Sequence, residues 1–188
     1  MRIEAIYPKL KLSRRNEEHK VYPYLLKGIK IERPDHVWST DITYIRIGTG
    51  FVYLTAVIDW YSRYVLSWRL SNNLENTFCI EVLEEALAIS QPEIFNTNQG
   101  SQYTSLNFLK LLTDGNIKIS MDSKGRALDI IFVERLWRTV KYEKVYLKDY
   151  QTMKSAYSSL KAYLKFYNKE RLHQALKYKT PESMYRAV

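Results

Sequence analysis

Hydrophobic and polar residues alternate over three consecutive segments in the first half of the chain. The segments 40–47, 51–58 and 63–70 are rich in β-branched and aromatic residues, which favour strands. Residues 48–50 and 59–62 separate them, and both stretches have the composition of turns. The pattern predicts a three-stranded antiparallel meander.

A helical spacing follows the meander. Four apolar residues recur every three or four positions and predict a helix over about 75–90: Phe78, Val82, Ala86 and Ile89. Gln91-Pro92 ends this helix, because proline disfavours helical backbone at the residue before it.

The second half of the chain alternates short apolar runs with helical patterns. Strands are predicted at 94–97 and 117–121, with a helix between them at 106–112. A long helix is predicted over about 127–146, and its core stripe is Ile130, Val133, Trp137 and Val140. A last amphipathic helix is expected at 152–167. This order predicts an α/β fold, with a mixed sheet of three antiparallel strands and two more strands, flanked by helices.

The length of 188 residues suits one principal domain. Residues 1–34 are rich in Lys, Arg, Tyr and Pro and are expected to form a basic arm or linker, with one short packed segment at 22–27. Residues 35–150 are expected to form the core domain. Residues 151–188 are expected to form a C-terminal helix and a tail packed on that domain.

Charge and cysteine content narrow the class of protein. Lys and Arg number 29 against 20 Asp and Glu, so the net charge is +9, which indicates either a polyanionic partner or a soluble basic surface. The single Cys79 excludes an internal disulfide and a cysteine-rich zinc site. The chain has no apolar run of membrane-spanning length and no secretory signal, so a cytoplasmic location without membrane contact is expected.

Three short strings carry candidate chemistry. They are Trp38-Ser-Thr-Asp-Ile-Thr-Tyr-Ile45, Phe95-Asn-Thr-Asn-Gln-Gly-Ser-Gln-Tyr-Thr104 and Leu128-Asp-Ile-Ile-Phe-Val-Glu-Arg-Leu-Trp137. Their polar candidates are Asp41, Asn98 and Glu134, with 35 residues between the last two. Taken singly, Asp41 is more simply explained as an edge-strand or turn residue, and Glu134 as a partner of Arg138 or a solvated helix position.

In this order and at this spacing, the strings resemble the DDE transposases of bacterial insertion sequences, which belong to the retroviral integrase core superfamily. The resemblance runs from Glu4-Ala-Ile-Tyr7 to the tail strings Tyr167-Asn-Lys-Glu-Arg-Leu-His173 and Thr180-Pro-Glu182. It implies a ribonuclease H-like fold and metal-dependent cleavage and strand transfer of DNA. It also implies two Mg²⁺ or Mn²⁺ ions in a competent member, held by residues matching Asp41, Asn98 and Glu134. Element ends and target DNA are the implied partners, together with further copies of the chain.

The sequence departs from the family pattern at two positions. The family has Asp where this chain has Asn98, and commonly Asn where it has Ile130. Asn98 keeps an oxygen but lacks the negative charge, so we expect weaker binding of the second metal and impaired or absent catalysis. Asp129 and Asp59 are possible substitute ligands, although neither has the matching position. Family members also carry a helix-turn-helix-like region before the linker, so the chain is expected to be an N-terminally truncated product.

Further residues are candidates for DNA contact. Five basic residues near Glu134 could bind phosphates, or form an ordinary solvated face: Lys124, Arg126, Arg135, Arg138 and Lys141.

Near Asn98, Gln99 and Gly100 suit either a plain turn or a close approach of backbone to DNA, and Tyr103 either stacks on a base or covers the sheet edge. Trp137 is expected in the core, and His173 as a structural hydrogen-bond partner. The leading interpretation is a transposase catalytic core. The alternatives are a noncatalytic DNA-binding remnant and a ribonuclease H-like nuclease of another kind.

Overall fold

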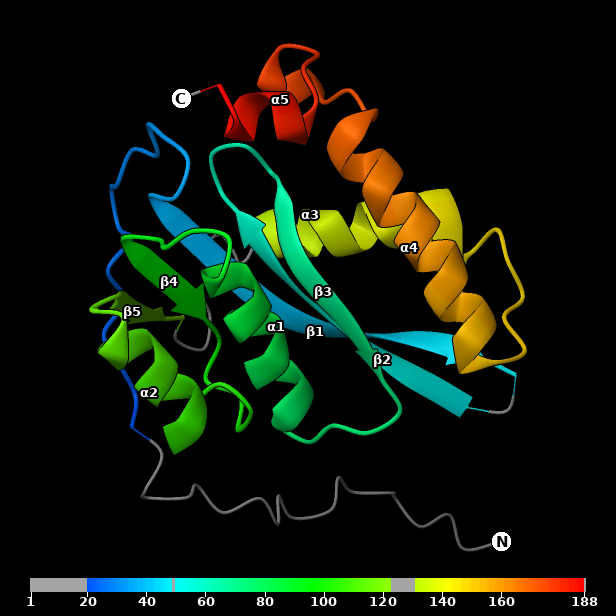
Figure 1. Cartoon of the computed structure of the whole chain (residues 1–188), viewed down its shortest axis with the longest axis horizontal. Coiled ribbons are helices and arrows are strands. Elements are labelled where there is room, and N and C mark those ends of the chain that lie inside the picture. Colours follow the sequence, from blue (N-terminus) through cyan, green and yellow to red (C-terminus); the bar gives the residue numbers. More distant parts are fainter. Residues whose placement is uncertain (1–19, 49, 123–130, 188) are drawn as a thin grey trace, which may run out of the picture.

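The computed structural model describes residues 20–48, 50–122 and 131–187. A five-stranded mixed sheet forms the centre of the molecule, in the order β3-β2-β1-β4-β5 (Figure 1). The strands are β1 (Val37–Ile47), β2 (Gly50–Asp59), β3 (Val65–Ser71), β4 (Ile94–Thr97) and β5 (Lys118–Met121). The first three are antiparallel neighbours, whereas β4 is parallel to both β1 and β5. The α/β fold with a mixed sheet is therefore confirmed.

Helices cover both faces of the sheet. They are α1 (Thr77–Leu87), α2 (Leu106–Asp114), α3 (Ile131–Val140), α4 (Met153–Lys169) and α5 (Pro181–Tyr185), with a π-helical turn η1 (Lys141–Val145) and a 3₁₀ turn η2 (Gln174–Leu176). One core cluster joins α3, η1 and α4 to one face of β1, β2 and β3. A second cluster joins α1 and α2 to the opposite face.

The alternation of side chains along β1 explains this layering. Ile45 is buried with Val52 on the α3 side, whereas Trp38 is buried with Val57 on the α1 side. Asp41 has the same parity as Ile45. The strand therefore directs the Asp41 carboxylate toward the layer that contains α3.

The elements differ from the expected ones mainly at their ends. The α1 helix ends at Leu87, so Ile89 lies beyond it with 54% of its surface exposed, and its assignment to the apolar stripe was wrong. The described part of the long helix begins at Ile131 and changes to a π-helical turn after Val140. Ile130 lies outside the described residues. Leu136 occupies the buried stripe of α3 together with the expected apolar residues. The pattern did not predict α5 or η2.

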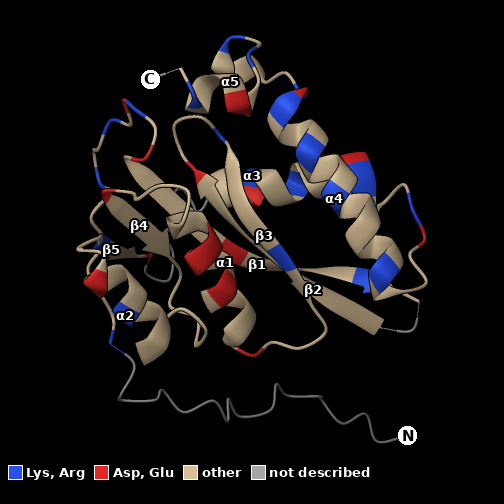
Figure 2. Cartoon of the chain, viewed as in Figure 1, with Lys and Arg blue, Asp and Glu red and all other residues tan. Residues whose placement is uncertain are grey.

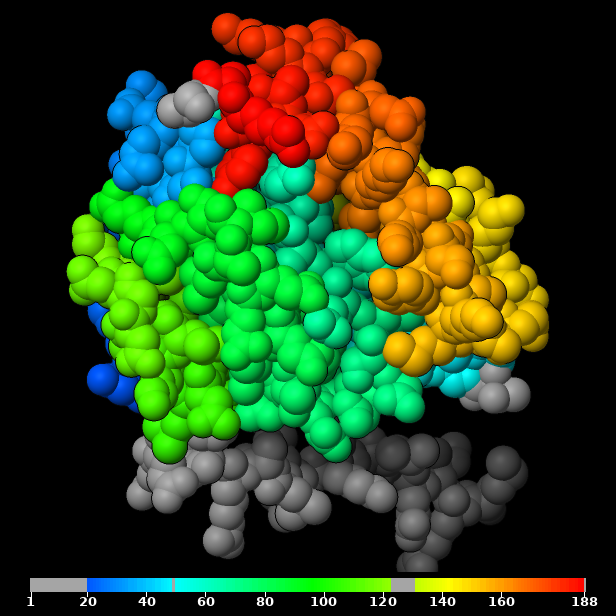
Figure 3. Space-filling model, in the orientation of Figure 1, coloured from blue at the N-terminus to red at the C-terminus, as the bar shows by residue number. Residues whose placement is uncertain are grey.

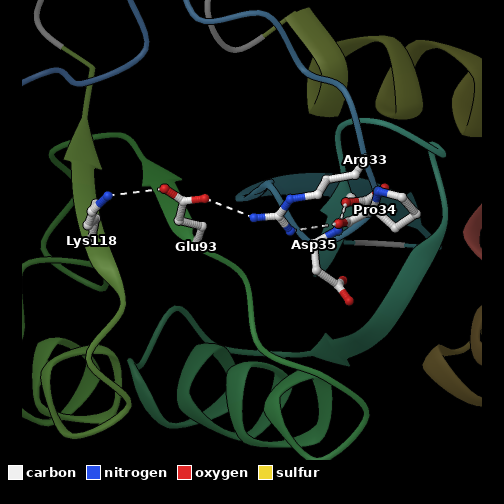
Figure 4. Close-up of polar contacts among 6 residues, drawn as sticks. Arg33, Pro34, Asp35, Glu93 and Lys118 are labelled. Carbon is white, nitrogen blue, oxygen red and sulfur yellow. Dashed lines mark hydrogen bonds and ion pairs between the residues drawn. The ribbon is translucent and has the colours of Figure 1, made fainter. Parts of the chain in front are cut away.

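Residues 20–34 pack beside the parallel edge of the sheet. The backbone N–H of Leu25 donates to Ser120 Oγ at 3.1 Å, and Leu26 is buried. Glu93 accepts hydrogen bonds from Arg33 at 2.9 Å and Lys118 at 3.1 Å (Figure 4). These exposed ion pairs contribute little stability but align this segment with the starts of β4 and β5.

The C-terminal residues close over the turn between β2 and β3 (Figure 3). Tyr185 stacks on Tyr64 with ring centroids 4.8 Å apart, and its hydroxyl donates to Asp35 Oδ1 at 2.7 Å. Two segments far apart in sequence are thereby joined next to the start of β1. No helix within the described ranges has both the length and the apolar character that a membrane span needs.

Candidate active site

The site lies where β1 and β4 separate. Their parallel pairing covers only three residue pairs and ends at Ser39 and Asn96. Asp41 and Asn98 each follow two residues after this last pair, Asp41 still within β1 and Asn98 just beyond β4. Because β1 continues toward β2 on one side while β4 leads away on the other, this is a topological switch point, where α/β sheets commonly bind ligands.

Asn98 donates a hydrogen bond directly to Asp41. Its Nδ2 lies 3.0 Å from Asp41 Oδ1, and its own Oδ1 accepts from the backbone N–H of Gly100 at 2.7 Å. The second bond determines the orientation of the amide. A flipped amide would place the Asn98 NH₂ group against the N–H of Gly100, so that two donors would face each other. Asn98 therefore presents an N–H to Asp41, in a place where a carboxylate would present an oxygen.

Helix α3 completes the surroundings of Asp41. Trp137 Nε1 donates to Asp41 Oδ2 at 3.2 Å, so both carboxylate oxygens accept hydrogen bonds from side chains. Burial raises the pKa of Asp41, and the nearby negative charge of Glu134 raises it further, whereas the bonds from Trp137 and Asn98 oppose the rise. Glu134 itself is exposed, three positions before Trp137. The three residues picked from the sequence are thus brought together.

Trp137 is buried, as expected, but sequence analysis missed its polar role. A tryptophan three positions after Glu134 lies on the adjacent part of the helix surface, and its N–H needs a partner when it is buried. The need of a buried indole N–H for an acceptor was therefore the signal in the sequence for this polar role. In the structure the indole both fills the core and orients the Asp41 carboxylate.

Basic residues of α3 and η1 lie beside the carboxylates. The charge of Asp41 raises the pKa of Lys141, against a larger lowering by burial, which places the two side chains near each other. Lys141 Nζ also lies 5.4 Å from the ring centroid of Tyr44. Arg138 is exposed and lies over the ring of Tyr142 at 5.9 Å. Arg135 is exposed on the same helix.

Other expected site residues have different outcomes. Tyr103 is only 1% exposed and packs against Phe108, so base stacking by its ring is corrected to a core role. Gln99 is exposed in the loop after β4, and Gly100 is partly exposed. Lys124, Arg126 and Asp129 lie outside the described residues.

Asp59 does not offer a substitute ligand for the site. One of its oxygens accepts from Ser62 and the other from the backbone N–H of Asp35 at 3.0 Å. Cys79 is buried, and this burial raises the pKa of its thiol to about 12. Asp59 therefore belongs to a separate set of contacts, whereas the charge of Asp41 adds to the raised pKa of Cys79.

The donor set fits one divalent ion better than two. Asp41 and Glu134 supply the hard oxygen atoms that Mg²⁺ prefers, and two carboxylates suffice when waters and a phosphate complete the coordination. The described ranges contain no group of three or more His, Cys, Asp or Glu residues suited to a metal. The Asn98 oxygen is engaged by Gly100. Asn98 therefore does not supply the third carboxylate that a two-ion site needs.

The chain is similar to known proteins over most of its length. Residues 31–127 match one model of the integrase core domain, and residues 115–181 match another model of that domain. The transposase for insertion sequence element IS629 of Shigella sonnei is 30% identical over 80% of this chain and 51% of its own length. The transposase for IS904 of Lactococcus lactis is 32% identical over 85% of this chain and 65% of its own length. The chain thus spans between half and two thirds of these curated relatives.

Solved structures show the same fold. The HTLV-2 integrase catalytic core domain in complex with magnesium has a TM-score of 0.64 at 18% identity, over 84% of this chain and 99% of that one. A chain of the simian T-cell lymphotropic virus intasome has a TM-score of 0.70 at 22% identity, over 91% of this chain and 60% of that one. The fold is therefore ribonuclease H-like. With more than half of its length matching the family model, the chain belongs to the integrase core domain family, of the kind found in the transposases of bacterial insertion sequences.

Proposed function

We propose that this chain is a transposase catalytic core that acts on DNA phosphodiesters by cleavage and strand transfer, and that Asn98 impairs its catalysis. Residues 35–150 form the catalytic unit in this proposal, and residues 151–188 pack on it as a tail. Element ends and target DNA are its substrates, and it works as an oligomer on DNA. The similarity to IS629 and IS904 transposases supports this assignment.

Asp41 and Glu134 are the proposed ligands of Mg²⁺ or Mn²⁺. When bound there, a divalent ion supplies charge stabilisation for the oxygens of the reacting phosphate. Trp137 and Asn98 hold the Asp41 carboxylate in one orientation through their hydrogen bonds. Arg138 and Lys141 bind the DNA phosphates beside the reacting group, because they lie on the same face of the helix as Glu134.

The single observation that carries the proposed impairment is the contact of 3.0 Å between Asn98 Nδ2 and Asp41 Oδ1. An amide N–H carries partial positive charge and directs it at the carboxylate that a metal would use. The amide also adds no negative charge to offset a second ion. Together the two effects weaken the binding of divalent ions. The attacking oxygen and the leaving oxygen of the phosphodiester displacement are then not stabilised at the same time.

The same contact favours a second candidate function. In the structure, both Asp41 oxygens accept N–H donors, which compete with a divalent ion for this carboxylate. A core of this kind could bind DNA without cutting it and could assemble with intact transposase subunits. Both functions require DNA binding, but only the first includes cleavage and strand transfer.

A strand-exchange assay separates these functions. The substrate is a branched DNA that mimics the strand-transfer product, because its reversal needs only the chemistry of the core. With Mg²⁺, we expect Asn98→Asp to form at least about 100-fold more product than the natural chain, which corresponds to about 2.7 kcal/mol of transition-state stabilisation. Asn72→Asp adds the same charge at an exposed turn and serves as the matched control.

Each outcome of this assay decides a different point. Equal product from the natural chain and Asn98→Asp would contradict the impairment. Binding of the branched DNA by both proteins without any product would support the noncatalytic role. No binding of this DNA by either protein would overturn both proposed functions.

A further inference from the structure

A basic groove extends from α3 to the segment before α5. It consists of two adjoining cavities of about 500 and 450 Å³, which share Arg63, Phe132 and Ala175. We call it the α3–tail groove. Besides Arg63 and Phe132, the lining of the first cavity includes Arg135, Arg138, Tyr142 and His173.

Positive charge dominates the lining of the α3–tail groove. Its five cationic residues are Arg63, Arg135, Arg138, Lys177 and Lys179. The one carboxylate in the lining is Glu143, which is already bonded to Arg171 at 2.9 Å and to the hydroxyl of Tyr163 at 2.7 Å. Burial lowers the pKa of His173 to about 4, so this ring is neutral at physiological pH. The groove therefore carries a net positive charge.

Arg63 is held in place without a carboxylate partner. Within the described ranges, neither Arg63 nor Arg135 nor Arg138 makes an ion pair. The Arg63 side chain is half-buried, donates to the carbonyl of Trp60 and lies 3.8 Å from the ring centroid of Phe132. Burial lowers the pKa of Arg63 to about 10 and the charge of Arg135 adds to this lowering, whereas Tyr167 and Asp59 oppose it. A guanidinium that is fixed in place and makes no ion pair within the described ranges suits the binding of a phosphate.

The groove is continuous with the candidate active site around α3. At 100° per residue, Lys141, Glu134 and Arg138 follow one another on the exposed surface nearest Trp137. Tyr142, Arg135 and Thr139 continue that exposed surface toward the groove. Basic residues are prominent along α3 and α4, whereas α1 on the opposite face carries acidic ones (Figure 2). Tyr142 is 65% exposed, so an aromatic face lies beside these cations.

We propose that the α3–tail groove binds the phosphate backbone of a DNA segment that continues from the reacting phosphate across α3 to the tail. The placement of this segment rests on the proposed function, because the reacting phosphate defines where it begins. Arg138 binds at the boundary between the site and the groove. Arg135 and Arg63 bind phosphates within the groove, and Lys177 and Lys179 extend the contact toward α5.

The salt dependence of DNA binding tests this proposal. The full chain is titrated with a fluorescent duplex in EDTA, so that no metal contributes, over about 50 to 200 mM salt. The slope of log K against log salt is negative, and each lost phosphate contact reduces its magnitude by about 0.9. We expect that decrease for Arg135→Gln, and a decrease of about 1.8 when Arg63→Gln is added. Lys110→Gln on the opposite face is the matched control and keeps the original slope.

Arg135 is exposed, so its substitution leaves the core intact, and the melting temperature of each variant checks the fold. Arg135→Lys retains the charge and should restore the slope. An unchanged slope in Arg135→Gln would overturn the groove proposal, as would a changed sedimentation coefficient of this variant without DNA, which would indicate a second copy in the groove. Absent strand exchange in Asn98→Asp, with the groove effects intact, would contradict the catalytic proposal alone.

Discussion

At the scale of single residues, Asn98 carries an NH₂ group in place of one oxygen of the aspartate that the family resemblance implies at this position. The exchange removes a charge and also creates a chain of hydrogen bonds from Gly100 through Asn98 to Asp41. Such bonds each contribute about 1 kcal/mol in proteins. A divalent ion that binds Asp41 must therefore compete with these bonds.

Gly100 tests this chain of hydrogen bonds. A Cβ at Gly100 would lie 2.8 Å from Asn98 Oδ1, so Gly100→Ala should push the Asn98 amide away from both partners. We expect a loss of about 1 kcal/mol in the free energy of unfolding, measured with urea. Gly50→Ala is the matched control, because a Cβ there meets nothing within 4 Å. Equal losses in the two variants would show that the Asn98 contacts are not responsible.

At the scale of elements, a polar clasp fastens the tail to the end of the α3 region. Glu143 in η1 accepts from Arg171 and from Tyr163 of α4. His173 lies edge-on to Tyr167 with ring centroids 4.9 Å apart, and Arg171 Nη1 is 3.3 Å from its Nε2. The clasp connects η1, α4 and the segment that follows α4, so its strength affects how firmly α3 is held.

The clasp predicts a specific pH dependence of stability. Burial lowers the pKa of His173 to about 4, from an ordinary value of 6.5. Between these values the unfolded chain binds a proton that the folded chain does not, so stability falls as pH falls. Between pH 7 and pH 5, urea unfolding should show a loss of about 1 to 2 kcal/mol attributable to this ring. His173→Gln should remove that loss, and an identical pH dependence in both proteins would contradict the assignment.

The sequence predicted those elements whose stability depends on local pattern. The meander, β4 and α4 were expected within a few residues of their observed positions, since their apolar residues follow strand and helix periods. The short α5 and η2 were missed, because they depend on contacts such as Tyr185 with Tyr64.

The same distinction applies to the site. Asp41 and Asn98 were identified from their motifs, whereas the hydrogen bond from Trp137 and the burial of Tyr103 depend on packing between distant segments. The spacing of residues along one helix or strand does not determine such contacts.

At the scale of the whole molecule, contacts between the ends of the described chain hold the fold around the site. Asp35 accepts hydrogen bonds from Trp38 at 2.9 Å, from Ser90 at 2.6 Å and from Tyr185 at 2.7 Å. This carboxylate therefore joins the start of β1, the segment after α1 and the C-terminal helix. The site at the β1–β4 junction and the tail that lines the groove depend on the same framework.

The hydrogen bond from Tyr185 to Asp35 can be removed by substitution, which measures how much it contributes to holding the C-terminal helix in place. Tyr185→Phe removes the hydroxyl but keeps the ring stacked on Tyr64. We expect the free energy of unfolding to fall by about 1 to 2 kcal/mol, because the Asp35 carboxylate loses one partner. Tyr178→Phe, at a ring that is 67% exposed, should be neutral. A neutral Tyr185→Phe would mean that the tail is held by apolar packing alone.

The amide of Asn98 is expected to limit how many divalent ions the core can hold. Calorimetric titration with Mg²⁺ of the natural chain, Asn98→Asp and Asp41→Asn measures this number. We expect two ions bound by Asn98→Asp, one weakly bound ion in the natural chain and none in Asp41→Asn. Binding of two ions by the natural chain, with affinities equal to those of Asn98→Asp, would contradict this expectation.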